Sequence, residues 1–252
     1  MLNRKYFVFL AALSCFFTTG QVGAGWASGA VDNSVYAELL KKYVKEDGVD
    51  YQGFKNEESK LGQYLKVLEK TEPGKLSRNE QFAFYINAYN AWTIKLILSG
   101  YPGVKSIKEL GGIFKSPWKK RLARIDGDRV TLDHLEHGIL RPRYKDPRVH
   151  FAINCASKGC PPLRSEPYMG DVLNQQLDEM TRAFINDPRR NRVEGKKLYV
   201  SRIFKWFKED FGNDIVGFFQ EYAQGDLKKE LDSNREEIEV EYLSYDWSLN
   251  GR

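Results

Sequence analysis

Apolar residues recur at helical spacing along much of the chain. Between Glu57 and Leu68 they fall on one face of a helix, which is made of Leu61, Tyr64, Leu65 and Leu68. Further helices are expected over about 33–44, 170–185, 204–207 and 216–222. The aromatic residues of the last two segments are interpreted as core.

The segment that ends at Gly100 is the most clearly marked helix. Ser77 and Glu80 have the spacing of a capping box, which begins a helix, and Gly100 followed by Pro102 ends one. Apolar side chains cover nearly its whole circumference: Phe82, Phe84, Tyr85, Ile86, Tyr89, Trp92, Ile94, Leu96 and Ile97. A helix that is apolar all round is buried, so we predict a central helix enclosed by the rest of the domain.

Two asparagines, Asn87 and Asn90, interrupt this apolar helix. They lie three positions apart and therefore share a face. A buried amide without partners costs about 1–3 kcal/mol, so both side chains must meet polar groups. We expect them to bond to neighbouring backbone, and a role in lining a binding site is the alternative.

Short extended segments separate the helices. An Asp-Gly turn between residues 121–125 and 129–131 is typical of a hairpin, and a second hairpin turn is expected at Glu194–Gly195. Strands are also expected over 149–154, where apolar and polar residues alternate, and over 237–242. The pattern predicts an α+β fold, a mostly helical single domain with a buried central helix and a small antiparallel sheet.

The first 24 residues have the pattern of a secretory signal peptide. Arg4 and Lys5 precede an apolar run over 7–17, which is too short to cross a bilayer, and small residues follow at 22–24. We expect a mature domain over 25–252 that is exported to the periplasm or secreted. Lipid attachment at Cys15 is disfavoured, because the three residues before it match that signal poorly.

Composition and charge exclude some classes of function. Loss of residues 1–24 removes Arg4 and Lys5 and no acid, so the formal net charge falls from +5 to +3. Basic clusters such as 141–148 are interspersed with acids and are interpreted as solvated surface. We expect a small-molecule or peptide ligand, with no nucleic acid, no cofactor and no membrane span in the mature chain.

Histidines gather in the middle of the chain. A short helix over 132–140 places His134 and His137 on one turn. The strand predicted over 149–154 directs His150 away from the main apolar layer and toward that helix. His137 and His150 are therefore candidates for one polar cluster, whereas His134 is interpreted as a solvated or satisfied side chain.

Cysteines follow immediately after this strand. The mature chain keeps Cys155 and Cys160, and two cysteines at this spacing favour a disulfide in an oxidising compartment. A bridge across so short a loop would shape the loop more than it would stabilise the domain. Pro161 and Pro162 exclude regular structure directly after it.

Four stretches of this region resemble one family. In chain order they read FYINAYNA at 84–91, LEHGILR at 135–141, HFAINCAS at 150–157 and CPPLR at 160–164. They are similar to the motifs of domain of unknown function family 547 (DUF547), found in bacteria and plants, over about 76–222. The closing YDWSLN at 245–250 resembles the tail of bacterial members.

The resemblance implies a set of polar pattern residues and no activity. His134 is not among them, and the set is Asn87, Asn90, Glu136, His137, Arg141, His150, Asn154, Cys155, Ser157, Cys160 and Arg164. The helix over 88–100 and the residues after it also resemble the core helix of transglutaminase and papain-like folds. In those folds the nucleophilic cysteine begins that helix, whereas here the asparagines occupy the region.

A thiol nucleophile is the first hypothesis for this cluster. Cys155 or Cys160 would attack an acyl carbon after activation by His137 or His150, oriented by Glu136 or an asparagine. The expected reaction is acyl transfer, or hydrolysis of a peptide or amide. The remaining pattern residues are expected to bind the substrate: Asn87, Asn90, Arg141, Asn154, Ser157 and Arg164.

Zinc binding is the second hypothesis. His137, His150 and the two cysteines are ligand types that tetrahedral zinc accepts, with Glu136 in reserve. The four residues between the cysteines meet the spacing of compact zinc motifs only marginally, and no metal ligands are predicted.

A non-catalytic role is the third hypothesis. The two cysteines would form a disulfide that shapes a loop, while Glu136 and His137 join an internal polar network. The domain would then bind a peptide, a glycan or a protein partner in the cell envelope. The sequence leaves the three hypotheses open.

Overall fold

The computed structural model describes residues 31–46, 48–112, 115–233 and 237–252. The predicted signal peptide over 1–24, including Cys15, lies outside the described residues. Within the described part, the fold is mostly helical with small sheets, which confirms the predicted α+β class.

The helices and strands have the following bounds. The helices are α1 Ser34–Tyr43, α2 Tyr51–Asn56, α3 Glu58–Lys70, α4 Arg78–Leu98, α5 Arg141–Tyr144, α6 Val149–Ala152, α7 Leu173–Ile185, α8 Ile203–Trp206, α9 Ile215–Tyr222 and α10 Gly225–Ser233. A π-helix spans His134–Leu140, and 3₁₀ helices span Pro73–Lys75, Ile107–Leu110, Pro117–Lys119 and Lys208–Phe211. The strands are β1 Val44–Lys45, β2 Gly48–Val49, β3 Ala123–Ile125, β4 Asp128–Val130, β5 Arg192–Glu194, β6 Lys197–Val200 and β7 Glu239–Tyr242.

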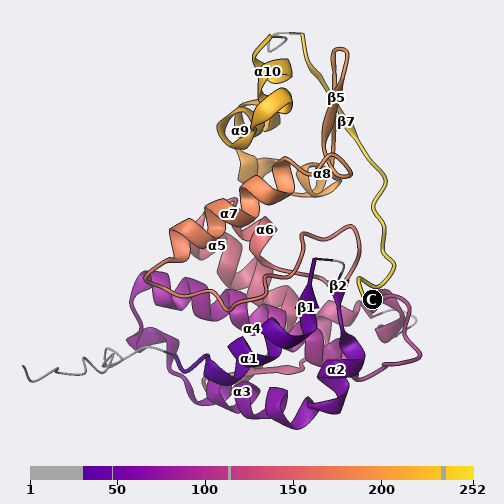
Figure 1. The fold of residues 1–252 in the computed structure, drawn as a ribbon. Helices are drawn as coiled ribbons and strands as arrows, with labels where there is room; N and C mark the ends of the chain where they lie inside the picture. The colour runs from indigo at the N-terminus through magenta and orange to yellow at the C-terminus, as the bar shows by residue number, and fades with distance from the viewer. Residues whose placement is uncertain (1–30, 47, 113–114, 234–236) are drawn as a thin grey trace, which may run out of the picture.

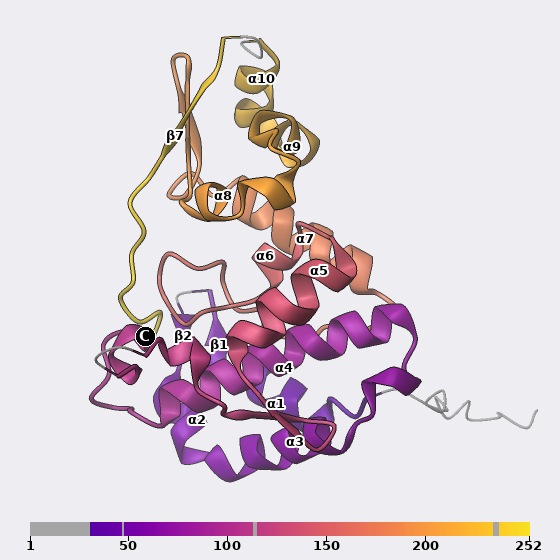
Figure 2. The same cartoon turned by 180° about the vertical axis from the view of Figure 1, so that it is seen from behind.

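The elements form two layers with a connection between them. Figure 1 shows α1 to α4 in the lower layer and α7 to α10 with β5 to β7 in the upper one. From behind, α5 and α6 lie between the two (Figure 2). After β7 the chain descends along one side and ends beside β1 and β2, where Gly251 forms a bridge with Val49.

Helix α4 is the buried central helix that its apolar circumference predicts. The Ser77 side chain accepts from the Glu80 amide, and the Glu80 side chain accepts from the Ser77 amide, so the capping box is present. Nearly every residue from Phe82 to Leu98 is buried. The helix packs against α2, α3 and the π-helix, which makes it the central element of the lower layer.

The sheets are smaller and more scattered than predicted. Both expected hairpins form, β3 with β4 and β5 with β6. Asp126 and Gly127 have φ of 51° and 77°, as a type I′ turn requires. Strand β7 then pairs parallel with β6, so this sheet is not purely antiparallel.

The predicted strand over 149–154 is wrong. Residues 149–152 form the one-turn helix α6, in which the amides of His150 and Phe151 donate to carbonyls three residues back. All four of its side chains are buried, so the apolar–polar alternation does not mark an exposed face. His150 is therefore enclosed, contrary to the expectation that it points away from the apolar core.

None of the helices within the described residues is long and apolar enough to span a membrane.

Replacement of Asn87 by leucine tests the role of the helix amides. Asn87 donates to the Tyr168 carbonyl at 2.8 Å and accepts from its amide at 2.9 Å. Asn87→Leu leaves both buried groups unpaired, so the free energy of unfolding should fall by about 2–5 kcal/mol in urea titrations. The same substitution at exposed Asn56 should cost under about 0.5 kcal/mol. Equal stability of the two variants would contradict this assignment.

Candidate functional site

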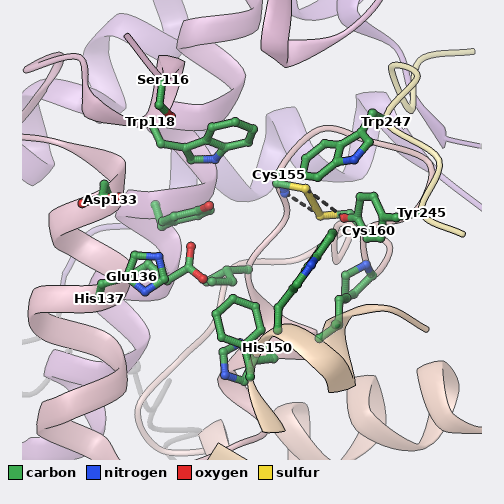
Figure 3. A pocket seen from close by; sticks show the side chains of 16 residues that line it. Ser116, Trp118, Asp133, Glu136, His137, His150, Cys155, Cys160, Tyr245 and Trp247 are labelled. Carbon is green, nitrogen blue, oxygen red and sulfur yellow. Dashed lines mark hydrogen bonds between the residues drawn. A yellow bond between two sulfur atoms is a disulfide. The ribbon is translucent and has the colours of Figure 1, made fainter. Parts of the chain in front are cut away.

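A cavity of about 240 Å³ lies where α4, the π-helix, the cysteine loop and the C-terminal segment meet. All five residues predicted as catalytic line it: Glu136, His137, His150, Cys155 and Cys160. The other lining residues are Tyr89, Ser116, Trp118, Asp133, Ile153, Pro161, Ile203, Trp206, Phe207, Tyr245 and Trp247. In Figure 3, Glu136 and His137 face the two cysteines and Tyr245 from the opposite side.

The cysteine loop is closed by a disulfide between Cys155 and Cys160, whose Cα atoms are 6.1 Å apart. The Cys155 amide also donates to the Cys160 sulfur at 2.8 Å. Ala156 has a φ of 61°, which turns the chain sharply inside the ring. The predicted disulfide is therefore present, and in this state neither sulfur is a free thiol.

An asparagine pair fixes this loop to the central helix. Asn90 donates to the Ala152 carbonyl at 3.0 Å and accepts from the Asn154 amide at 2.8 Å. The Asn154 side chain donates in turn to the Pro161 carbonyl and accepts from the Ala156 amide. Neither asparagine lines the cavity, and both hold the backbone that forms one of its walls.

The C-terminal segment lies along the other side of the cysteine loop. The amides of Lys158 and Gly159 donate to the carbonyls of Ser248 and Asp246, and the Asn250 amide donates to the Ala156 carbonyl. Antiparallel pairing of this segment with the loop brings Tyr245 and Trp247 into the cavity wall.

The Tyr245 hydroxyl also contacts the cysteine loop. It lies 3.2 Å from the Cys155 sulfur and 3.1 Å from the Ser157 hydroxyl. Its ring packs on Gly159, where a Cβ atom would come within 2.9 Å of the ring. Burial raises the pKa of Tyr245 to about 12, although the Ser157 hydrogen bond and Arg190 oppose that shift. The phenol is therefore protonated at neutral pH.

The π-helix directs Glu136 into the cavity. Pro142 has no amide hydrogen, and the Arg141 amide donates to the carbonyl of Glu136, five residues back. Within this widened turn Glu136 is 9% exposed, while His137 is exposed at the rim. Burial first, and then the nearby Glu136 carboxylate, raise the pKa of the Tyr89 hydroxyl well above its usual range.

A separate ion-pair network holds His150. Its Nε2 lies 2.7 Å from Asp210 Oδ2, and its ring stacks on Phe207 with centroids 4.0 Å apart. Arg141 donates to both oxygens of the same carboxylate, at 2.5 and 3.0 Å. The Arg141 guanidinium also donates to Nδ1 of His137 at 3.0 Å. Both histidine rings are thus fixed by partners.

The remaining predicted binding residues lie outside the cavity lining. Asn87 bonds to the Tyr168 backbone, and Ser157 packs under Tyr245. Arg164 forms ion pairs with Glu166 and Glu179 and lines a larger neighbouring hollow.

Among the described residues, no group of three or more His, Cys, Asp or Glu side chains is arranged to hold a metal ion. The arrangement therefore gives no support to the zinc hypothesis.

Sequence reasoning missed the aromatic walls. Trp118, Trp206, Phe207 and Trp247 line the cavity, and Trp206 is 42% exposed rather than part of the core. The rings of Trp206 and Trp247 lie 4.8 and 4.6 Å from that of Tyr245. The YDWSLN tail was a visible signal for Tyr245 and Trp247, but no local pattern brings it to the cysteines.

These features define an α+β domain with a disulfide-bridged, aromatic-walled cavity. The sequence model of the family described as "Protein of unknown function, DUF547" matches residues 73–185, which supports the assignment of this segment to that family. The match ends earlier than the expected residue 222. No curated protein and no solved structure matched the chain.

Removal of the Asp210 charge tests the network around His150. Burial acts to raise the pKa of Asp210, but hydrogen bonds from His150 and Arg141 outweigh it and hold the pKa well below its usual range. Asp210→Asn should therefore lower the free energy of unfolding at pH 7 by about 1–3 kcal/mol. The carboxylate stabilises the fold above its ordinary pKa of about 4 and less as pH falls below it.

The measurement is urea unfolding followed by circular dichroism from about pH 7 to about pH 3. The difference between wild type and Asp210→Asn should shrink toward low pH. Asp226→Asn, at an exposed ion pair with Lys229, is the control and should change stability by under about 1 kcal/mol. A difference that stays constant with pH would argue against the charge as the cause.

Proposed function

We propose that this protein is an exported binding domain whose disulfide-bridged cavity takes a small molecule or the end of a peptide. The observation that carries the proposal is an open, aromatic-walled cavity whose cysteines are bonded to each other rather than held as thiols. Concave, largely apolar sites with a few polar groups are typical of small-ligand binding.

Export is part of the proposal. It is supported by the basic and apolar pattern of residues 1–24 and by the disulfide, since disulfides persist in oxidising compartments. The disulfide also supports the binding role, because it holds the loop that carries one cavity wall.

Thiol catalysis is the second candidate, and one observation favours it. Cys155 is partly exposed in the same cavity as Glu136 and His137, so a reduced Cys155 would face a substrate bound there. In the bridged state the nucleophile is missing, and His137 lies across the cavity from the sulfur (Figure 3). Acyl transfer or amide hydrolysis would therefore require the reduced protein.

Intact-mass analysis separates these two candidates. The full chain is expressed with its amino-terminal segment in a host with an oxidising envelope, and the purified product is alkylated before and after reduction. We expect no adduct before reduction and two adducts after it, on a chain that begins near residue 25. Adducts before reduction would favour the thiol enzyme, and an uncleaved chain would contradict export.

Tryptophan fluorescence tests ligand binding directly, because three of the five tryptophans line the cavity. A panel of amino acids, dipeptides, amines and simple sugars is titrated into the oxidised protein. At least one compound should give a saturable change that Trp206→Ala weakens by about tenfold. Val172→Ala, at another exposed apolar residue, is the control and should leave it unchanged. A panel without any saturable response would contradict the proposed function.

A further inference from the structure

The charged residues of the cavity are all acidic apart from the histidines. Asp133 and Glu136 line it, and among its described lining residues there is neither a lysine nor an arginine. Basic side chains beside the cavity have other partners, among them Arg190, which pairs with Asp187. Arg141 pairs with Glu209 and Asp210, and Lys108 lies over the Trp247 ring at 3.7 Å without lining the cavity.

Glu136 is the group that this arrangement leaves without a counter-charge. Its carboxylate is nine-tenths buried and points into the cavity from the π-helix (Figure 3). Within the described part of the chain it forms no ion pair, and its interaction partner is the Tyr89 hydroxyl. A buried carboxylate without a cation is costly by several kcal/mol, and a bound cation would offset that cost.

Aromatic rings complete the surroundings of this carboxylate. Trp118, Trp206, Tyr245 and Trp247 form a continuous cluster, with neighbouring centroids between 4.6 and 5.9 Å apart. The faces of such rings attract cations, most strongly when the cation is shielded from water. Lys108 already makes this contact with Trp247.

We propose that the cavity binds an organic cation, an alkylated or free ammonium group whose charge lies against Glu136 and whose carbon atoms contact the tryptophans. This inference rests on the proposed binding function and names the ligand class. An anion would be repelled by two carboxylates, and a neutral apolar ligand would leave Glu136 buried without a counter-charge. A cavity of about 240 Å³ fits a compact ligand or a side chain rather than a drug-sized molecule.

The test compares two probes of nearly the same shape. Choline carries a quaternary nitrogen, and 3,3-dimethyl-1-butanol has carbon at that position and no charge. Titration calorimetry and tryptophan fluorescence on the oxidised full chain should give choline an affinity about tenfold or more above that of the neutral alcohol.

Variants assign the selectivity to Glu136. Glu136→Gln should weaken choline binding by about tenfold or more and leave the alcohol unchanged, because the variant removes the charge and keeps the shape. Glu179→Gln, an acid paired with Arg164 outside the cavity, is the matched control and should bind choline like wild type. Trp206→Ala, at a ring that is 42% exposed, should also weaken choline binding about tenfold.

The outcomes separate this inference from the proposed function. Equal binding of choline and the alcohol, or an unchanged affinity of Glu136→Gln for choline, would overturn the cation assignment and leave a binding domain. Failure of choline and of every amine to bind, while an uncharged sugar of the panel binds, would do the same. Failure of every compound would overturn both proposals.

Discussion

The amide of Asn90 is the contact on which the candidate site depends. It lies on a helix that is buried all round, so its donor and acceptor must both find partners inside the protein. They find them in the backbone on either side of Ile153, at the Ala152 carbonyl and the Asn154 amide. The Asn154 side chain makes the same two kinds of hydrogen bond within the cysteine loop. It donates to the Pro161 carbonyl and accepts from the Ala156 amide. The side-chain amides of Asn90 and Asn154 therefore fix the backbone on both sides of the disulfide. The bridge closes the loop that these hydrogen bonds hold in place.

A second layer of contacts completes the cavity from a distant part of the sequence. The C-terminal segment pairs with the outer side of the cysteine loop and brings in Tyr245 and Trp247, while α8 supplies Trp206. These aromatic residues lie beyond the segment that matches the family, whereas Glu136, His137 and both cysteines lie inside it. Trp118 lies inside the matched segment, so the aromatic walls come partly from it and partly from the chain beyond it. The family match carries no information about Trp206, Tyr245 and Trp247.

Local signals predicted the helices well because capping, periodicity and termination act within one segment. The capping box at Ser77 and the all-round apolar pattern located α4, and the asparagines on it bond to backbone as expected. The segment at 149–154 failed for a long-range reason: its polar-looking His150 is buried by Phe207 and Asp210, about sixty residues away, so alternation did not report exposure. The cavity residues of the cysteine region were predicted by motif. The place of Trp206 in the cavity could not be predicted from the sequence. An aromatic residue in a short amphipathic helix has the same pattern whether it packs in a core or lines a cavity.

The charges in the cavity favour the binding function over thiol catalysis. A thiolate at Cys155 would share its cavity with the carboxylates of Glu136 and Asp133, and like charges in one cavity oppose its formation. The cation that usually offsets this is an imidazolium close to the sulfur, but His137 lies across the cavity from Cys155, with its Nδ1 3.0 Å from the Arg141 guanidinium. His150 is turned toward Asp210. The negative charge of these carboxylates would repel a thiolate at Cys155. The same charge would attract a bound cation. The disulfide removes this repulsion, since bonded sulfurs carry no charge, and the carboxylate of Glu136 stays available to the cation proposed above.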